Sequence, residues 1–144
     1  MRNSDTVELL KECSAGIKMA VDSLDEVMDY VESDDLKKTL TDSKRAHKRI
    51  DMECFRMLKE LNEIEKEPNI MAKGMSWLKT NVKLGIEQSD ATIADLVTEG
   101  SNMGVKSLNR YMNQYKAADD KVRAMAEDLI KIERQLIIDV SQYL

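Results

Sequence analysis

The sequence predicts an all-α protein, a four-helix bundle with a long crossover between its second and third helices. Proline occurs once and glycine five times in 144 residues, so little interrupts helix formation. Apolar residues recur at spacings of three and four along four long segments, as in helices that bury one face. The length fits a single domain, residues 1–144, which can bury a core without disulfides or a metal.

Two helices are predicted in the N-terminal half. The first covers about residues 5–32 and begins at Asp5, whose carboxylate suits the positive end of the helix dipole. The second covers about residues 34–66, with Ser33 as its N-cap, and ends before the lone Pro68. The apolar face of the first helix consists of Leu10, Cys13, Ile17, Val21, Leu24, Met28 and Val31.

The segment 67–89 separates these helices from two more. It carries the proline, two glycines and the only tryptophan, which predict a crossover with one short helix at MSWLKT. The third helix covers about residues 90–115, and the fourth covers about 119–143 with Asp119 as its N-cap. Two hairpins joined by a long connection form the topology of ferritin-like bundles, and a simple up-down-up-down order is the alternative.

Charge and hydropathy argue against two classes of partner. The net charge of −5 opposes binding to nucleic-acid phosphates. No apolar run approaches the length of about 20 residues that a membrane span needs, and the N-terminus has no signal segment. We therefore expect a cytoplasmic protein that binds neither nucleic acid nor membrane.

The sulfur-containing residues are interpreted as part of the core. Cys13 and Cys54 are far apart and lack a metal-binding spacing, so we expect buried free thiols rather than a disulfide or a zinc site. The ten methionines are expected to fill the core adaptably, an exposed methionine-rich groove being the alternative.

The only histidine, His47, lies on the predicted core face of the second helix. At about 100° per residue it continues the apolar stripe of Leu40 and Ile50, while the basic side chains around it project outward. On the fourth helix, Glu133 falls in the middle of the apolar face. A buried carboxylate needs a cation, a hydrogen-bond donor or a metal.

These two residues define a candidate site. The rise of about 1.5 Å per residue puts them at similar depths in either topology, so their side chains can meet. Glu99 of the third helix and Asp51, one turn after His47, lie at the shoulders of their apolar faces. Imidazole and carboxylate ligands suit Fe, Mn or Zn, so the candidate metal ligands are His47, Glu133, Glu99 and Asp51. The alternative, which we favour, is a buried ion pair between His47 and Glu133 that fixes the helix register.

Two glycines, Gly100 and Gly104, lie one turn apart inside the third helix, where each costs about 1 kcal/mol relative to alanine. They indicate either the close approach of a neighbouring helix or room for a ligand or metal.

The C-terminal half contains a loosely spaced series of motifs. These are Trp77-Leu78-Lys79, Ser89-Asp90 with Ile93, Gly100, and Lys106-Ser107-Leu108 with Tyr111, followed by an apolar final helix. With the inward histidine of the second helix, the series resembles an uncharacterised bacterial family, a domain of unknown function, among the ferritin-like four-helix bundles. The resemblance covers essentially the whole chain.

The ligand pattern of ferritin-like carboxylate proteins is only partly present. Those proteins bind two metals with a Glu from each of two helices and a Glu-x-x-His from each of the other two. Here the residue three before His47 is Lys44, the fourth helix has no histidine, and only Asp25 of the first helix approaches the core face. The resemblance therefore implies a degenerate di-metal motif, without the ligands of a di-iron oxidase or an iron-storing ferritin.

Motifs for other chemistry are missing from the sequence. It has no Gly-rich phosphate loop, no nucleophile elbow, and no second histidine to serve a serine or cysteine as base. We expect a non-catalytic bundle that acts as a homo-oligomer or with a protein partner, with candidate surface aromatics Phe55, Trp77, Tyr111 and Tyr115. The alternative is a divergent metal-binding or redox-stress protein with one mononuclear site at His47 and Glu133.

Overall fold

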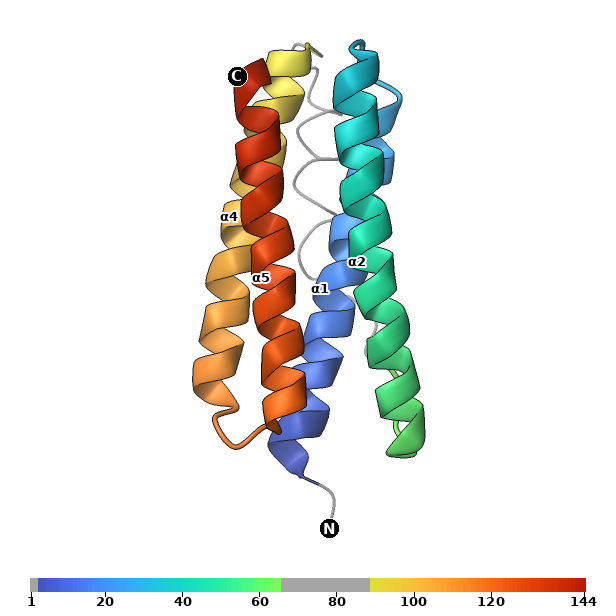
Figure 1. Ribbon diagram of the computed structural model, residues 1–144, viewed down its shortest axis with the longest axis vertical. Helices are drawn as coiled ribbons and strands as arrows, with labels where there is room; N and C mark the ends of the chain where they lie inside the picture. Colours follow the sequence, from blue (N-terminus) through green and yellow to red (C-terminus); the bar gives the residue numbers. More distant parts are fainter. Residues whose placement is uncertain (1–2, 66–88) are drawn as a thin grey trace.

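The computed structural model describes residues 3–65 and 89–144, and within these ranges the chain is helical without strands. The elements are α1 (Ser4–Met28), α2 (Asp34–Glu60), α4 (Asp90–Gln114), α5 (Asp120–Val140) and a short 3-10 helix, η1 (Ser141–Tyr143). The predicted all-α class with four helices is confirmed (Figure 1). The predicted crossover and its short helix lie outside the described residues.

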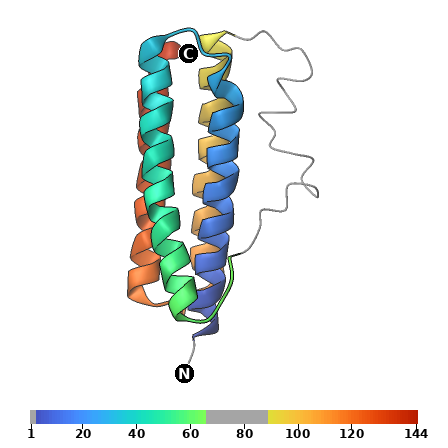
Figure 2. The same ribbon diagram turned by 90° about the vertical axis from the view of Figure 1, so that its right-hand side faces the viewer.

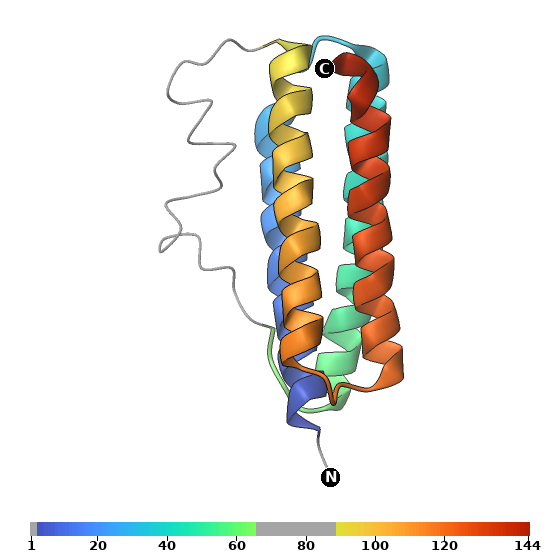
Figure 3. The same cartoon turned by 90° about the vertical axis from the view of Figure 1, so that its left-hand side faces the viewer.

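The four helices lie side by side as two hairpins. α1 packs mainly on α2 and α4 mainly on α5, while α2 also contacts α5 and α1 also contacts α4. α1 and α5 run in one direction along the bundle, and α2 and α4 run in the opposite direction (Figures 1 and 3). The last turn of α2 and the first turn of α4 therefore lie at opposite ends of the bundle (Figure 2).

Short polar side chains cap three of the helices. The side chain of Asn3 accepts hydrogen bonds from two first-turn amides of α1, and Ser33 and Ser89 each accept one in α2 and α4. Each such cap contributes about 1 kcal/mol. Asp119 occupies the predicted N-cap position of α5 but makes no side-chain cap bond.

The first helix ends at Met28 rather than near Glu32 as predicted. The carboxylate of Asp90 accepts hydrogen bonds from the backbone amides of Glu32, at 2.8 Å, and Ser33, at 3.0 Å. A residue at the start of α4 thus stabilises the connection between α1 and α2 as a turn.

The second helix ends at Glu60, well before the predicted end near residue 66. Asn62 adopts a φ of 58°, in the left-handed region that asparagine tolerates better than most residues. The amide of Glu63 then donates to the carbonyl of Leu58 at 2.8 Å, which closes the helix end.

Two apolar clusters fill the core, one toward each end of the bundle. The cluster near the start of α1 includes Leu9, Leu10, Cys13, Ile17, Cys54, Leu58, Leu108, Val122, Met125, Ala126, Leu129 and Ile130. The cluster near the turn from α1 to α2 includes Leu24, Val27, Val31, Leu36, Leu40, Ile93, Leu96, Val97, Leu136 and Val140. The side chains of His47 and Glu133 fall between the two clusters along α2 and α5, so a polar layer crosses the middle of the core.

No helix in the described ranges carries an apolar stretch that could span a bilayer.

Candidate functional site

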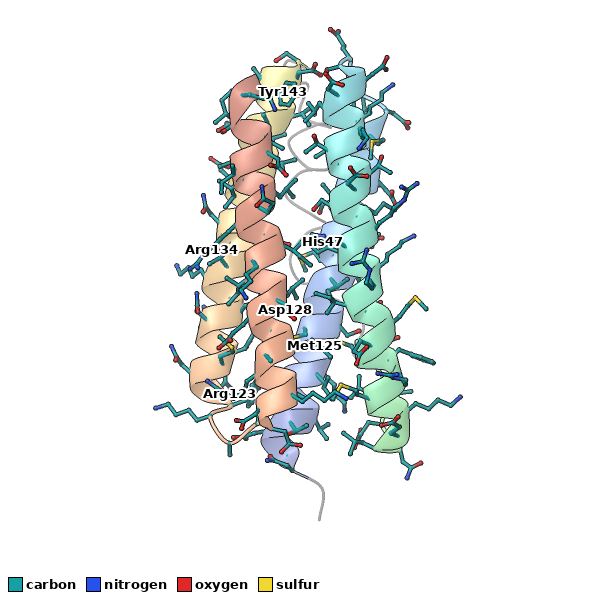
Figure 4. All side chains as sticks on the ribbon, viewed as in Figure 1. His47, Arg123, Met125, Asp128, Arg134 and Tyr143 are labelled. Atoms are coloured by element: carbon teal, nitrogen blue, oxygen red, sulfur yellow. The ribbon has the colours of Figure 1, made fainter. Side chains whose placement is uncertain are left out.

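His47 of α2 and Glu133 of α5 form a direct hydrogen-bonded ion pair between the two hairpins. The imidazole Nε2 faces the carboxylate Oε1, and the two residues are only 1 % and 6 % exposed. Figure 4 shows His47 on the side of α2 that faces α5. The sequence predicted that both side chains point inward and can meet, and the structure brings them into contact.

The second nitrogen of the imidazole fixes its protonation. Nδ1 lies 2.7 Å from the backbone carbonyl of Ser43, which can only accept a hydrogen bond, so Nδ1 carries a proton. Burial lowers the pKa of His47, but the carboxylate of Glu133 and the carbonyl of Ser43 outweigh burial, and the pKa is raised above its ordinary value. The pair is thus an imidazolium facing a carboxylate.

Gly104 of α4 lies beside this carboxylate. A Cβ at this position would lie 3.5 Å from Oε2 of Glu133, in ordinary van der Waals contact with it. The neighbour of this glycine is therefore a charged side chain rather than the backbone of an adjacent helix. Residues of α2, α4 and α5 therefore meet at the polar layer.

The other two candidate ligands lie elsewhere. Glu99 is exposed on α4. Asp51 turns toward α1, where its carboxylate accepts hydrogen bonds from Ser14 at 2.9 Å and from Lys18 at 3.3 Å. The structure thus brings two of the four residues together, and a helix wheel that places a residue at a shoulder does not determine which neighbour it meets.

The donor set does not fit the di-metal pattern of ferritin-like carboxylate proteins. Among residues 3–65 and 89–144, no three His, Cys, Asp or Glu side chains are grouped so that they could hold a metal ion. Lys44 occupies the position where that pattern has a glutamate, and its amine pairs outward with Asp25 of α1. Whether a single ion binds at His47 and Glu133 stays a prediction.

A second polar cluster, missed by the sequence analysis, joins α1, α2 and the residues after α2. Lys18 is its central cation, with Nζ 2.7 Å from Glu65, 3.3 Å from Asp51 and 2.9 Å from the hydroxyl of Ser14. We call Ser14, Lys18, Asp51 and Glu65 the lysine cluster. The only sequence signal was the spacing of Ser14 and Lys18, one turn apart at the edge of the first helix.

The lysine cluster holds one cation, Lys18, between two carboxylates, Asp51 and Glu65. Burial lowers the pKa of Lys18, but the carboxylates of Glu65 and Asp51 outweigh burial. The pKa is therefore raised above its ordinary value, and the amine remains an ammonium. Burial raises the pKa of Asp51 despite its hydrogen bonds, whereas the bonds from Lys18 and Ser14 outweigh burial and lower the pKa of Glu65. The hydroxyl of Ser14 donates to the carboxylates of both Asp51 and Glu65, so it adds hydrogen bonds to the acidic side of the cluster.

The candidate surface aromatics differ in exposure. Phe55 is 53 % exposed on the outer side of α2. Tyr111 and Tyr115 are half-buried, pack against the core and stack with ring centroids 6.5 Å apart. Trp77 lies outside the described residues. Phe55 is thus the one of these three described residues that presents an aromatic ring to solvent.

No protein-family model, curated protein or solved structure matches this chain.

Proposed function

We propose that this protein is a non-catalytic, ferritin-like four-helix bundle that works by associating with a second copy of itself. The observation that carries the proposal is the outer surface of α2, where Met52 and Phe55 are 73 % and 53 % exposed. They are three residues apart and therefore neighbours on the helix surface. Large apolar side chains grouped on a surface are typical of protein contacts.

The ferritin-like class is supported by the helix directions. α2 and α4 run the same way, so the segment between them has to connect opposite ends of the bundle (Figures 1 and 2). That order is expected for two hairpins joined by a crossover and differs from the up-down-up-down alternative. We therefore assign the segment 67–89 the role of the crossover.

Charge complementarity favours a second copy as the partner. Residues 45–59, which surround the two apolar side chains, contain five basic and two acidic residues. Residues 19–44, at the other end of the same hairpin, contain eight acidic and three basic residues. A two-fold arrangement with the copies antiparallel puts the basic region of each on the acidic region of the other, as an isologous interface requires.

A mononuclear metal site at His47 and Glu133 is the second candidate, but the pair gives it little support. Nε2 of His47 and Oε1 of Glu133 are already bound to each other, and Nδ1 is protonated and held by Ser43. An ion would have to break the pair and find further ligands. The geometry suits a structural ion pair better.

The test is sedimentation equilibrium of the purified protein over a wide concentration range, on the parent and on the Met52→Ser/Phe55→Ser variant. We expect the parent to dimerise, more weakly at high salt, and the variant to remain monomeric. The matched control is Met103→Ser/Ile138→Ser, which removes two apolar side chains that are 57 % and 63 % exposed on α4 and α5.

Each outcome is decisive for the proposal. A parent that is monomeric at every concentration would overturn self-association, and the α2 surface would then have to serve a different protein. If the control variant loses association as completely as the α2 variant, the interface is not on α2. Circular dichroism of all variants verifies that the bundle is folded.

A further inference from the structure

Two sulfur atoms from different helices touch in the core cluster near the start of α1. Sγ of Cys54 in α2 lies 3.2 Å from Sδ of Met125 in α5. Cys54 is fully buried and Met125 is 7 % exposed. Figure 4 shows Met125 on the side of α5 that faces the bundle interior.

A third sulfur belongs to the same cluster. Cys13 of α1 is fully buried and is a free thiol, like Cys54. The hydrogen bond between Ser14 and Asp51 shows that these two residues lie at the same height along the bundle axis. Cys13 directly precedes Ser14, and Cys54 follows Asp51 by about one helical turn, so the two cysteines also lie at similar heights. Both thiols therefore lie at the level where the lysine cluster joins α1 to α2.

We propose that Cys13, Cys54 and Met125 form a binding site for one soft monovalent metal ion, copper(I). Thiolate and thioether sulfur are the protein ligands that select this ion over the harder divalent metals. Three buried sulfurs from three helices offer it a low coordination number and protection from oxidation. The site is separate from the polar layer and does not depend on the proposed self-association.

Binding exchanges protons for the metal. In the free protein both thiols are protonated, because burial raises the pKa of Cys13 to about 12 and raises that of Cys54 as well. Copper(I) displaces the two S–H protons, forms two thiolate bonds and accepts a lone pair from the thioether, with no change in the oxidation state of copper or sulfur. Affinity therefore rises with pH.

Disulfide formation is disfavoured while the metal is absent. Burial, Cys13 and the carboxylates of Asp51 and Glu65 raise the pKa of Cys54 and only Lys18 lowers it, so the thiolates form when copper(I) itself supplies the positive charge. A protonated thiol is a poor nucleophile, so neither cysteine attacks oxidants readily while the metal is absent. The half-buried lysine cluster lies near Cys54, on the side of the site formed by α1 and α2.

The test is anaerobic titration of the reduced full-length protein with copper(I), buffered by the competing chelator bicinchoninate. We expect uptake of one equivalent with ultraviolet copper–thiolate absorption, and a higher melting temperature of the loaded protein. Cys54→Ala should lose this uptake. Met125→Leu, which conserves volume, should weaken it roughly ten- to a hundredfold, the range for loss of a supporting contact at a metal site.

Met103→Leu is the matched control, since it changes an exposed methionine on α4 and should bind copper(I) like the parent. Failure of the folded parent to take copper(I) from bicinchoninate would overturn the proposal. So would a Met125→Leu variant with unchanged affinity, or a parent that prefers zinc over copper(I). Should Cys54→Ala fail to fold, the comparison of Met125→Leu with Met103→Leu still decides the question.

Discussion

The two polar groups of residues inside this bundle differ in solvent access and in number of partners. His47 and Glu133 face each other in a buried layer, and the carboxylate of Glu133 helps to keep the imidazole charged. In the lysine cluster each charged side chain is about a fifth to a quarter exposed and has more than one partner. The His47–Glu133 pair joins the two hairpins, whereas the lysine cluster lies within the hairpin of α1 and α2 and the residues that follow α2.

This difference determines what each can tolerate. Removing one member of a dry pair leaves a buried charge with nothing to compensate it. Removing one member of a shared, half-buried cluster leaves partners that can still bind one another or water. The pair is therefore suited to fixing the register between hairpins, and the cluster to anchoring the chain after α2.

The largest expected effect comes from breaking the pair on one side. Glu133→Leu should destabilise the fold by about 3–5 kcal/mol, because the buried imidazole loses its counter-charge. The double variant His47→Leu/Glu133→Leu should recover most of that loss, since well-packed apolar residues replace a buried pair at little cost. Urea unfolding followed by circular dichroism measures both. A double variant as unstable as the single one would show that the layer is not a simple pair.

The stability of the protein should also depend on pH through this pair, by less than the loss expected for Glu133→Leu. The pKa of His47 is raised in the folded state, so the native protein holds this proton more tightly than the unfolded chain, whose histidine pKa is about 6.5. The resulting stabilisation is complete below about pH 6.5 and is lost as pH rises through the folded pKa. The parent should therefore lose stability with rising pH relative to the double leucine variant. Parallel unfolding curves for the two proteins across this range would contradict the assigned imidazolium.

The lysine cluster should respond less to the loss of its cation. Lys18→Met should cost about 1–3 kcal/mol at neutral pH, because Asp51 and Glu65 then face each other without a positive charge. The cost should shrink as the pH falls and the carboxylates take up protons. Lys38→Met is the control, since its pair with Asp42 is mostly exposed and worth little. Equal losses in the two variants would mean that the cluster contributes no more than a surface ion pair.

The sequence was sufficient for residues whose direction the helix period fixes. His47 and Glu133 lie near the centres of their apolar faces, so a small error in the wheel leaves them pointing inward. Glu99 and Asp51 lie at the edges of such faces, where the same error moves a side chain from core to solvent. For Asp51 the outcome depends on Lys18, which lies 33 residues away in the sequence.

The helix ends were harder to predict for the same reason. α1 ends at a turn whose amides are bound by Asp90, and periodicity in residues 5–32 contains no information about that partner. The end of α2 depends on the local φ of Asn62, a signal that was present in the sequence but weak beside the continuing apolar spacing. Glu65, which was predicted to lie in the second helix, therefore follows the end of α2 and binds Lys18 in the lysine cluster.

The smallest expected effect concerns two glycines, one beside the buried carboxylate of Glu133 and the other in open surroundings. Gly16→Ala should stabilise the protein by about 1 kcal/mol, because its Cβ would meet nothing within 4 Å and the helix gains propensity. Gly104→Ala should gain less, since its Cβ would contact the carboxylate of Glu133 at 3.5 Å and shield it further from water. Urea unfolding of the two variants measures the difference. Equal gains in the two variants would mean that the contact with the new methyl group does not affect the carboxylate of Glu133. The ion pair with His47 would then be sufficient to stabilise that carboxylate in the core.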